Sequence, residues 1–316
     1  MNTSTQYRNL KKIIFMITIL GSASNIQAAD VVQLPAVNLG DTSFVDGIAG
    51  PGTLVKVLGN HFSANRFTDV NGNSLPGDNK LEANALLGQY AYISKTKILG
   101  GFYGAEVLLP LVDIEPDTTL TGLPNTGERG FGDLIVSPFL LQWTDHKIFG
   151  RPYFHRLNFV FLLPTGSYDA DNQVNTGSNI FSFNPYYAGT YFLTKKLTTS
   201  FRLHYLWNSE NDRPLSALNV DDTQPGTAFH MNYAASYALT KKLRIGVAGY
   251  YLNQLSEDEI NGISQANSEE KTFAIGPGLQ YHHKNNFLNI NYYFESGAEN
   301  RPEGHRIVAW LAWVFH

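Results

Sequence analysis

The sequence contains no cysteine among its 316 residues. Packing and backbone hydrogen bonds alone must therefore stabilise the fold, and neither thiol chemistry nor a thiolate metal site is possible. Charged residues make up only 16% of the chain, and 27 Asp and Glu outnumber 23 Lys and Arg. A protein that binds nucleic acid needs a basic face, so we expect no nucleic-acid partner.

Long hydrophobic runs are also missing. The apolar stretch at residues 13–20 is far shorter than the roughly 20 residues of a membrane-spanning helix, and no later segment approaches that length. Three cations precede this stretch and small residues follow it up to Ala28, which predicts a secretory signal peptide over residues 1–28. Its removal leaves 20 Lys and Arg against 27 Asp and Glu, a formal charge of −7. A membrane-anchoring helix is the alternative interpretation.

The sequence is rich in segments that alternate with a period of two residues. In residues 197–208, Leu197, Phe201 and Leu203 share one face, while Arg202 and His204 lie on the other. Such a strand is about twice as long as usual in a soluble domain, but it matches the roughly 9–11 tilted residues that cross a bilayer. The same alternation recurs in residues 228–237, 243–251 and 306–315.

Extending this pattern along the chain predicts an all-β fold, a transmembrane up-and-down antiparallel β-barrel of about 12 strands. The predicted strands start near the following residues: Thr53, Ala83, Leu99, Gly130, Tyr153, Ile180, Leu197, Thr227, Leu243, Lys271, Phe287 and His305.

The predicted connections alternate in length, which is typical of a membrane barrel with periplasmic turns at one end and external loops at the other. A soluble β-sandwich has no reason to sort its loops in this way, and an even strand number places both ends of the barrel on the periplasmic side. Short turns are expected at residues 94–97, 144–152, 194–196, 240–242 and 282–286, and long loops at 65–82, 110–129, 164–179, 209–226, 256–270 and 296–304.

Three prolines fall inside predicted strands, where each removes a donor from the hydrogen-bond ladder. We expect Pro138, Pro185 and Pro277 to mark bulges or strand ends.

The segment that precedes the first predicted strand, residues 29–51, lacks a sustained strand period and is rich in glycine and apolar residues. Burying each large apolar side chain contributes about 1–3 kcal/mol, so full solvation is unfavourable. We expect the segment either to lie in the periplasm or to occlude part of the lumen, ahead of a barrel formed by residues 52–316.

Charged residues within the predicted strands must point inward, because a charge facing lipid costs about 2–4 kcal/mol. They either pair across the lumen and hold the barrel closed, or line a polar conduit. The four arginines lie at different heights, so they do not form one ring as a simple anion filter would. The lumen-lining candidates are Lys56, Glu106, Arg156, Arg202, His204, His230, Arg244, Glu295 and Arg306.

Enzymatic and metal chemistry find little support. Some twelve-stranded outer-membrane proteins are phospholipases with a Ser-His-Asn group on the lipid face, but His204 and His230 fall on the polar face. The sequence has neither G-x-S-x-G nor H-E-x-x-H. Acidic pairs in the predicted external loops, such as Asp221 and Asp222, favour solvated charge over a calcium site. We expect no catalytic residues, no metal and no cofactor.

Two stretches carry a family resemblance. Residues 34–72 contain the pairs Asp46-Gly47 and Pro51-Gly52, and residues 161–179 read FLLPTGSYDADNQVNTGSN. These stretches resemble the family named for the meta-cleavage pathway of phenol degradation, which includes the SphA-type outer-membrane proteins. The resemblance implies a barrel that transports aromatic or other hydrophobic compounds, and it brings no binding residues that could be carried over.

We therefore expect a channel or transporter for small hydrophobic or aromatic molecules, located in the outer membrane. Its expected partners are outer-membrane lipid and lipopolysaccharide, the barrel-insertion machinery and a small-molecule substrate. The alternative is a protein without transport activity that acts through its external loops or as an envelope scaffold, and a membrane-embedded hydrolase is a more distant third.

Overall fold

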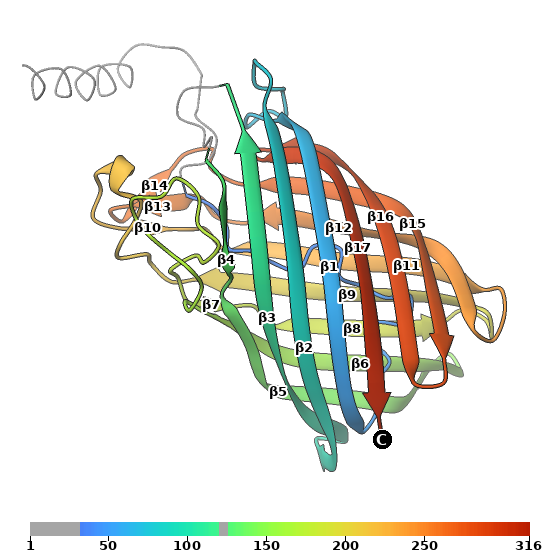
Figure 1. Cartoon of the computed structure of the whole chain (residues 1–316). Helices are drawn as coiled ribbons and strands as arrows, with labels where there is room; N and C mark the ends of the chain where they lie inside the picture. The colour runs from blue at the N-terminus through green and yellow to red at the C-terminus, as the bar shows by residue number, and fades with distance from the viewer. Residues whose placement is uncertain (1–31, 120–125) are drawn as a thin grey trace, which may run out of the picture.

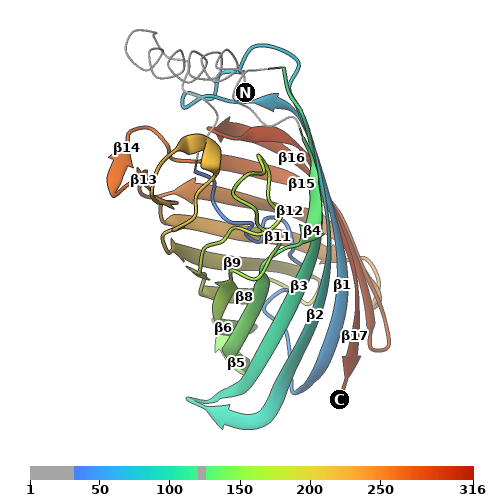
Figure 2. The same ribbon diagram turned by 60° about the vertical axis from the view of Figure 1, so that its left-hand side comes forward.

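The computed structural model describes residues 32–119 and 126–316, which form one closed antiparallel β-barrel (Figures 1 and 2). The main sheet follows the order β11-β12-β15-β16-β17-β1-β2-β3-β5-β6, continues through β7, β8 and β9, and closes because β9 also pairs with β11. Two short strands, β4 and β7, precede β5 and β8, so the wall has 12 strands, as the sequence predicts. The predicted signal peptide lies outside the described residues.

The strands of the first half of the wall are antiparallel to their neighbours, and most of them are long, except for β4, β7 and β8. They are β1 (Gly52–Phe67), β2 (Lys80–Ile98), β3 (Gly101–Asp117), β4 (Glu128–Phe131), β5 (Leu134–Ile148), β6 (Arg151–Leu163), β7 (Ser182–Phe183) and β8 (Tyr186–Phe192).

The second half completes the barrel and carries a small three-stranded sheet in its loops, with the order β10-β13-β14. Within residues 32–119 and 126–316, no helix is long and apolar enough to cross a membrane. The remaining elements are β9 (Leu197–Asn208), η1 (Ser216–Leu218), β10 (Thr223–Gln224), β11 (Ala228–Ala238), β12 (Leu243–Gln254), β13 (Asp258–Ile260), β14 (Ile263–Gln265), β15 (Lys271–His283), β16 (Asn286–Glu299) and β17 (Pro302–Phe315).

The predicted alternation of faces is confirmed along β9. The outward side chains of Leu203, Tyr205 and Trp207 are 37–46% exposed, whereas the inward His204 and Leu206 are buried. This is the pattern of a wall with lipid on one side and a filled interior on the other, since the outward residues are apolar and have no protein partner layer.

The short connections differ in detail from the prediction. The β2–β3 turn is Leu99-Gly100 rather than residues 94–97, and the β5–β6 turn is Phe149-Gly150, because the strands continue further at this end. All four turn residues have positive φ, as a two-residue type I′ hairpin requires. Leu99 and Phe149 are 85% and 95% exposed.

One of the long loops predicted at the other end is wrong, and another is shorter than predicted. Most of residues 296–304 continues the ladder as β16 and β17, which leaves only Asn300 and Arg301 between them, and the loop predicted at 110–129 is confined to residues 118–127, between β3 and β4. Polar residues do not end these strands, because the ladder extends past the apolar band into the aqueous layer. Long connections remain at residues 68–79, 118–127, 164–181, 209–227 and 255–270.

The three prolines behave in different ways. Pro138 lies in β5 at a bulge between Val136 and Phe139, and Pro185 separates β7 from β8. Pro277 lies within β15 with no change of register, and the pairing with β16 omits it. The expectation of bulges or strand ends therefore holds for the first two prolines and is wrong for the third.

Residues 32–51 lie inside the barrel and form no regular element (Figure 2). Leu39 and Phe44 from this segment join the main core cluster, together with inward residues such as Leu206, Tyr250 and Tyr293. The core of this barrel is therefore built partly from a segment that does not belong to the wall.

Candidate functional site

The upper part of the segment is held at the loop end of the barrel. The backbone N–H of Leu34 donates to Glu270 Oε1 at 3.3 Å, just before β15 begins. Further down, Gly40 N–H donates to Asn232 Oδ1 at 2.7 Å, and the Tyr293 hydroxyl donates to Gly40 O at 2.8 Å. The chain therefore enters the lumen from the loop end, where the first described residues lie.

The lower part of the segment continues towards the turn end. Phe44 N–H donates to Gln280 Oε1 at 3.0 Å, and Gly47 N–H donates to Thr190 Oγ1 at 2.8 Å. A Cβ on Gly47 would lie 2.5 Å from the backbone nitrogen of Thr190, so only glycine fits this close approach to β8. The segment then leads into β1 at Gly52, having run the height of the barrel.

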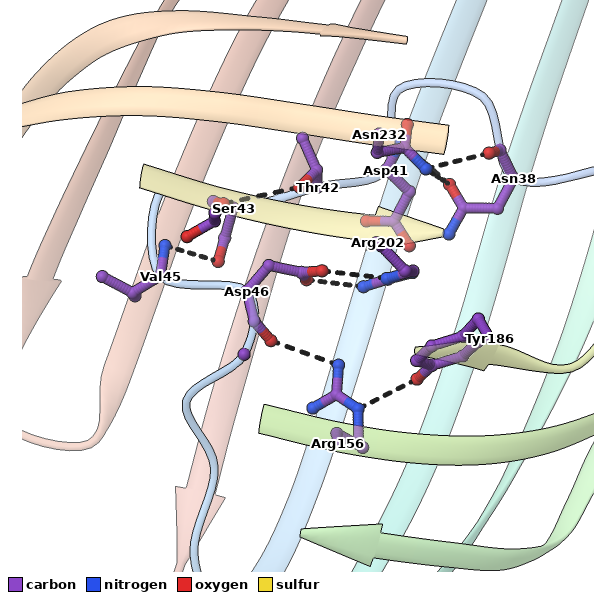
Figure 3. A network of polar contacts seen from close by, with 12 residues as sticks. Asn38, Asp41, Thr42, Ser43, Val45, Asp46, Arg156, Tyr186, Arg202 and Asn232 are labelled. Atoms are coloured by element: carbon purple, nitrogen blue, oxygen red, sulfur yellow. Dashed lines mark hydrogen bonds and ion pairs between the residues drawn. The ribbon is translucent and has the colours of Figure 1, made fainter. Parts of the chain in front are cut away.

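Asp46 joins this segment to a pair of arginines on the wall (Figure 3). Its carboxylate accepts from Arg202 Nε at 2.9 Å and from Arg202 Nη2 at 2.5 Å, a bidentate pair, while its backbone oxygen accepts from Arg156 Nη2 at 3.2 Å. Arg156 Nε also donates to the Tyr186 hydroxyl at 3.0 Å. Tyr186 presents its ring to both guanidiniums, with Arg202 4.9 Å and Arg156 5.5 Å from the ring centroid.

Glu106 is the wall carboxylate that lies beside this cluster. Its oxygens accept from Asn158 Nδ2 and Gln89 Nε2, both at 2.6 Å. Among the described residues, Glu106 forms no ion pair with Arg156 or Arg202, and it interacts with Arg156 only through longer-range electrostatics.

The two candidate histidines form a buried stack beside the arginine cluster. The rings of His204 and His230 have centroids 4.1 Å apart, and both receive Asn184 Oδ1 as a partner, at 3.2 and 3.1 Å. An amide oxygen only accepts, so each of these ring nitrogens carries the proton. Within the described residues, His204 Nε2 and His230 Nδ1 have no hydrogen-bond partner.

A second arginine network lies on the opposite part of the wall, on β12, β16 and β17. The Tyr250 hydroxyl donates to Glu295 Oε1 at 2.6 Å, and Arg306 Nε donates to the same hydroxyl at 3.1 Å. Arg306 also donates to Asn60 Oδ1 at 3.2 Å and lies 3.9 Å from Glu295. All of these groups belong to the wall.

The remaining two candidates lie apart from both networks. Lys56 pairs with Asp41 of the segment at 2.7 Å. Arg244, near the turn end, donates to Thr198 Oγ1 and Ser236 Oγ, and among the described residues it has no carboxylate partner. The structure thus brings six of the nine candidates into three clusters, which are the arginine cluster, the histidine stack and the Tyr250 network, and Glu106 lies beside the first of them.

Glu270 closes the loop end of the lumen together with Arg301, whose Nη1 donates to Glu270 Oε2 at 2.9 Å. Burial raises the pKa of Glu270 above its ordinary value of 4.5, and the neighbouring Arg301 charge and the Leu34 N–H oppose that rise only in part. A group of three or more residues able to hold a metal ion is absent from residues 32–119 and 126–316.

The residues that carry the family resemblance in the loop after β6 have a structural role here. Asp133 accepts from Gly166 N–H at 2.9 Å and from Ser178 N–H at 2.8 Å, which ties the loop to the start of β5. A Cβ on Gly166 would lie 2.6 Å from Gly177 Cα, so the two glycines pack backbone against backbone. This motif fixes the loop over the barrel end.

Asp41, Asp46, Tyr186 and Tyr250 belong to the site but were not among the sequence candidates. The first two carried a signal, because they are the acidic residues of an otherwise uncharged lumen segment at residues 32–51. The tyrosines carried none, since tyrosine is common on both faces of the barrel.

Comparison with solved structures shows what this barrel is similar to. The crystal structure of the COG4313 outer membrane channel from Pseudomonas putida F1 superposes with a TM-score of 0.75 at 18% identity, covering 89% of this chain and 100% of that one. The transport unit of the autotransporter AIDA-I from Escherichia coli (TM-score 0.49, 10% identity, 89% and 93% covered) and the TodX monoaromatic hydrocarbon channel (0.42, 8%, 85% and 91%) are more distant. The first likeness confirms the predicted fold.

Comparison of sequences identifies the family. No curated protein matches the chain. The family model described as "Putative MetA-pathway of phenol degradation" matches residues 64–311, which is more than half of the chain. The predicted family resemblance is thereby confirmed. The predicted outer-membrane location agrees with the fold that the chain shares with the solved outer membrane channel. This chain belongs to the family described as "Putative MetA-pathway of phenol degradation".

Proposed function

We propose that this protein is an outer-membrane channel for small hydrophobic or aromatic molecules. The observation that carries the proposal is the way in which residues 32–51 occupy the lumen. In the described part of the chain, no backbone-to-backbone hydrogen bond joins this segment to the wall, and each of its polar contacts with the barrel uses a side chain.

A segment held in this way differs from a strand of the wall. Side-chain contacts are worth about 0.5–1.5 kcal/mol each when water can replace them, so they can open one at a time. The ladder of β1 and β17, by contrast, must break cooperatively. The segment can therefore leave the lumen without breaking the ladder of the wall, at the cost of exposing Leu39 and Phe44 of the core cluster. A 12-stranded barrel without it has a lumen intermediate in width between a filled eight-stranded barrel and a wide porin.

The lining favours molecules with aromatic rings. Tyr186, Tyr250, Tyr293 and Trp310 all point inward among the charged groups, and such rings offer apolar area together with a polar edge. Channel activity also accounts for the absence of catalytic motifs, and we infer no enzymatic role. Lipopolysaccharide and the insertion machinery are the further partners that an outer-membrane barrel requires.

Planar-bilayer recordings test the proposal. The full chain should give small, infrequent conductance steps, and a signal-peptide fusion that begins near Gly50 should give larger or more frequent ones. The shift of the folded barrel on an unheated gel controls for correct folding. A folded full chain with no conductance and no uptake of toluene into vesicles would overturn the proposal, and unchanged conductance in the fusion would show that the segment is only a tether.

A further inference from the structure

The charges of the lumen do not balance on the wall alone. Of the nine lumen-lining candidates, five are cations and two are carboxylates, Glu106 and Glu295. Two further carboxylates come from the segment, where Asp46 pairs with Arg202 and Asp41 pairs with Lys56. Residues 32–51 contain no Lys or Arg, so the segment supplies only negative charge to a lumen that is otherwise cationic.

Asp46 binds Arg202 in the geometry by which an arginine side chain recognises a carboxylate ligand. A guanidinium presents two parallel N–H donors that match the two oxygens of a carboxylate, and such forked pairs are stronger and more specific than single hydrogen bonds. Both Asp46 oxygens are used, at 2.5 and 2.9 Å. The Arg202 and Asp46 side chains are only 11% and 7% exposed, so water screens the pair weakly.

The surroundings add an aromatic component to this anion site. The ring of Tyr186 lies under both guanidiniums, and its hydroxyl is held by Arg156. His204 packs against the same tyrosine with ring centroids 4.9 Å apart. An aromatic ring next to a carboxylate would find a flat partner here, as well as two cations.

We infer that Arg156, Tyr186 and Arg202 form a binding site for small organic carboxylates, preferably aromatic ones, and that Asp46 occupies this site as an internal substitute. The inference rests on the proposed channel function and names its substrate class. A carboxylate that enters the lumen competes with Asp46 for Arg202, and its binding displaces the segment. Occupancy of the site and opening of the path are therefore coupled.

Coupling of this kind requires that the ligand and the segment exclude each other. Asp46 occupies the Nε–Nη2 edge of the Arg202 guanidinium, so a carboxylate that takes this edge must replace Asp46. Arg156 can donate to the second oxygen of such a ligand, since its Nη2 now donates only to a backbone oxygen, at 3.2 Å. Once the segment is displaced, the anion can move through the lumen towards Arg244, the cation near the turn end.

The test uses the full chain in planar bilayers with benzoate and its neutral analogue benzyl alcohol. Benzoate should change the conductance at concentrations about tenfold below those at which benzyl alcohol acts. Asp46→Asn, which weakens the internal competitor, should lower the effective benzoate concentration by a further factor of about ten. Arg202→Gln should abolish the difference between the two compounds, and Arg202→Lys should restore it only in part, because lysine keeps the charge but not the fork.

Arg213→Gln, on an external loop where Arg213 donates to Asn179 Oδ1, is the matched control and should leave the benzoate response unchanged. Each variant must show the gel shift of a folded barrel. Equal responses to benzoate and benzyl alcohol, in the parent chain and in Asp46→Asn alike, would overturn the inference while leaving the channel function intact. The absence of any conductance would instead count against the channel itself.

Discussion

The two arginine–tyrosine networks of the lumen are built from the same residue types but are neutralised differently. On β12, β16 and β17, Arg306 and Tyr250 share Glu295, which is part of the wall. On β6, β8 and β9, the guanidinium of Arg202 is paired with Asp46, which is part of the lumen segment. The first network is complete without the segment, and the second is not.

This difference separates charge that holds the barrel from charge that is available to a ligand. Both partners of the pair within the wall are fixed to strands, so we expect this pair to contribute to stability. On the inference above, the pair between wall and segment can be exchanged for another anion. The two interpretations of the inward charges, pairing and conduction, would then apply to opposite sides of the same lumen.

The largest expected effect comes from Glu295→Gln. It removes the wall carboxylate whose side chain is fully buried and leaves Arg306 without a charged partner, which costs about 3–5 kcal/mol of unfolding free energy. Asp46→Asn should cost much less, because water can enter the lumen and hydrate Arg202 when the segment moves. Urea unfolding in lipid vesicles measures both, and equal losses would remove the distinction between the two networks.

The next effect distinguishes the two faces of β9. Leu203→Arg places a charge against lipid and should cost about 2–4 kcal/mol, enough to impair insertion. Arg202→Leu, one residue away on the inner face, should fold and should alter conductance. Both variants are compared by the gel shift after insertion into vesicles. Equal folding defects would contradict the alternation of faces on this side of the barrel.

A smaller perturbation locates the start of the segment. Gln33→Cys should label with an impermeant maleimide on intact cells, because Gln33 is exposed and lies next to the contact of Leu34 with Glu270 at the loop end. Cysteines at Asp171 and Asp222 serve as external controls. Cysteines at Lys196 and Lys242, in the turns, should not label. Failure of Gln33→Cys to label while the controls behave as expected would place the segment in the periplasm.

The smallest effect concerns pH and the loop end. Burial raises the pKa of Glu270, so the folded chain holds this proton up to a higher pH than the unfolded chain does. The contribution of this group to stability is therefore fullest below pH 4.5 and declines as the pH rises through the folded pKa. Glu270→Gln should flatten that decline when urea midpoints are compared at pH 4 and pH 7. The same slope in both chains would show that Glu270 is not the group responsible.

The sequence predicted the wall well because the pattern that identifies each strand lies within that strand. The alternation in β9 or β11 is local, and it determines both the strand and its faces. Strand ends were harder, since residues 296–299 of β16 look like a loop, but Ser296 and Glu299 still pair with β15 beyond the apolar band. Local polarity cannot distinguish a loop from a strand that extends into water.

The site was predictable only in part. Inward charges such as Arg202 and Arg306 follow from the period of their strands, but their partners lie far away in sequence. Asp46 is 156 residues from Arg202, and nothing local in either stretch indicates the other. Which arginine would find a wall carboxylate and which would depend on the segment is a property of the closed barrel alone.

The position of residues 32–51 also constrains the order of assembly. β1 and β17 close the barrel by pairing residues as far apart as Thr53 and Phe315. The segment that precedes β1 crosses the interior from the loop end to the turn end. Either β1 and β17 pair around a segment that is already in place, or the start of the chain threads through a barrel that has already closed. In either order, filling of the lumen and closure of the seam are linked steps of assembly.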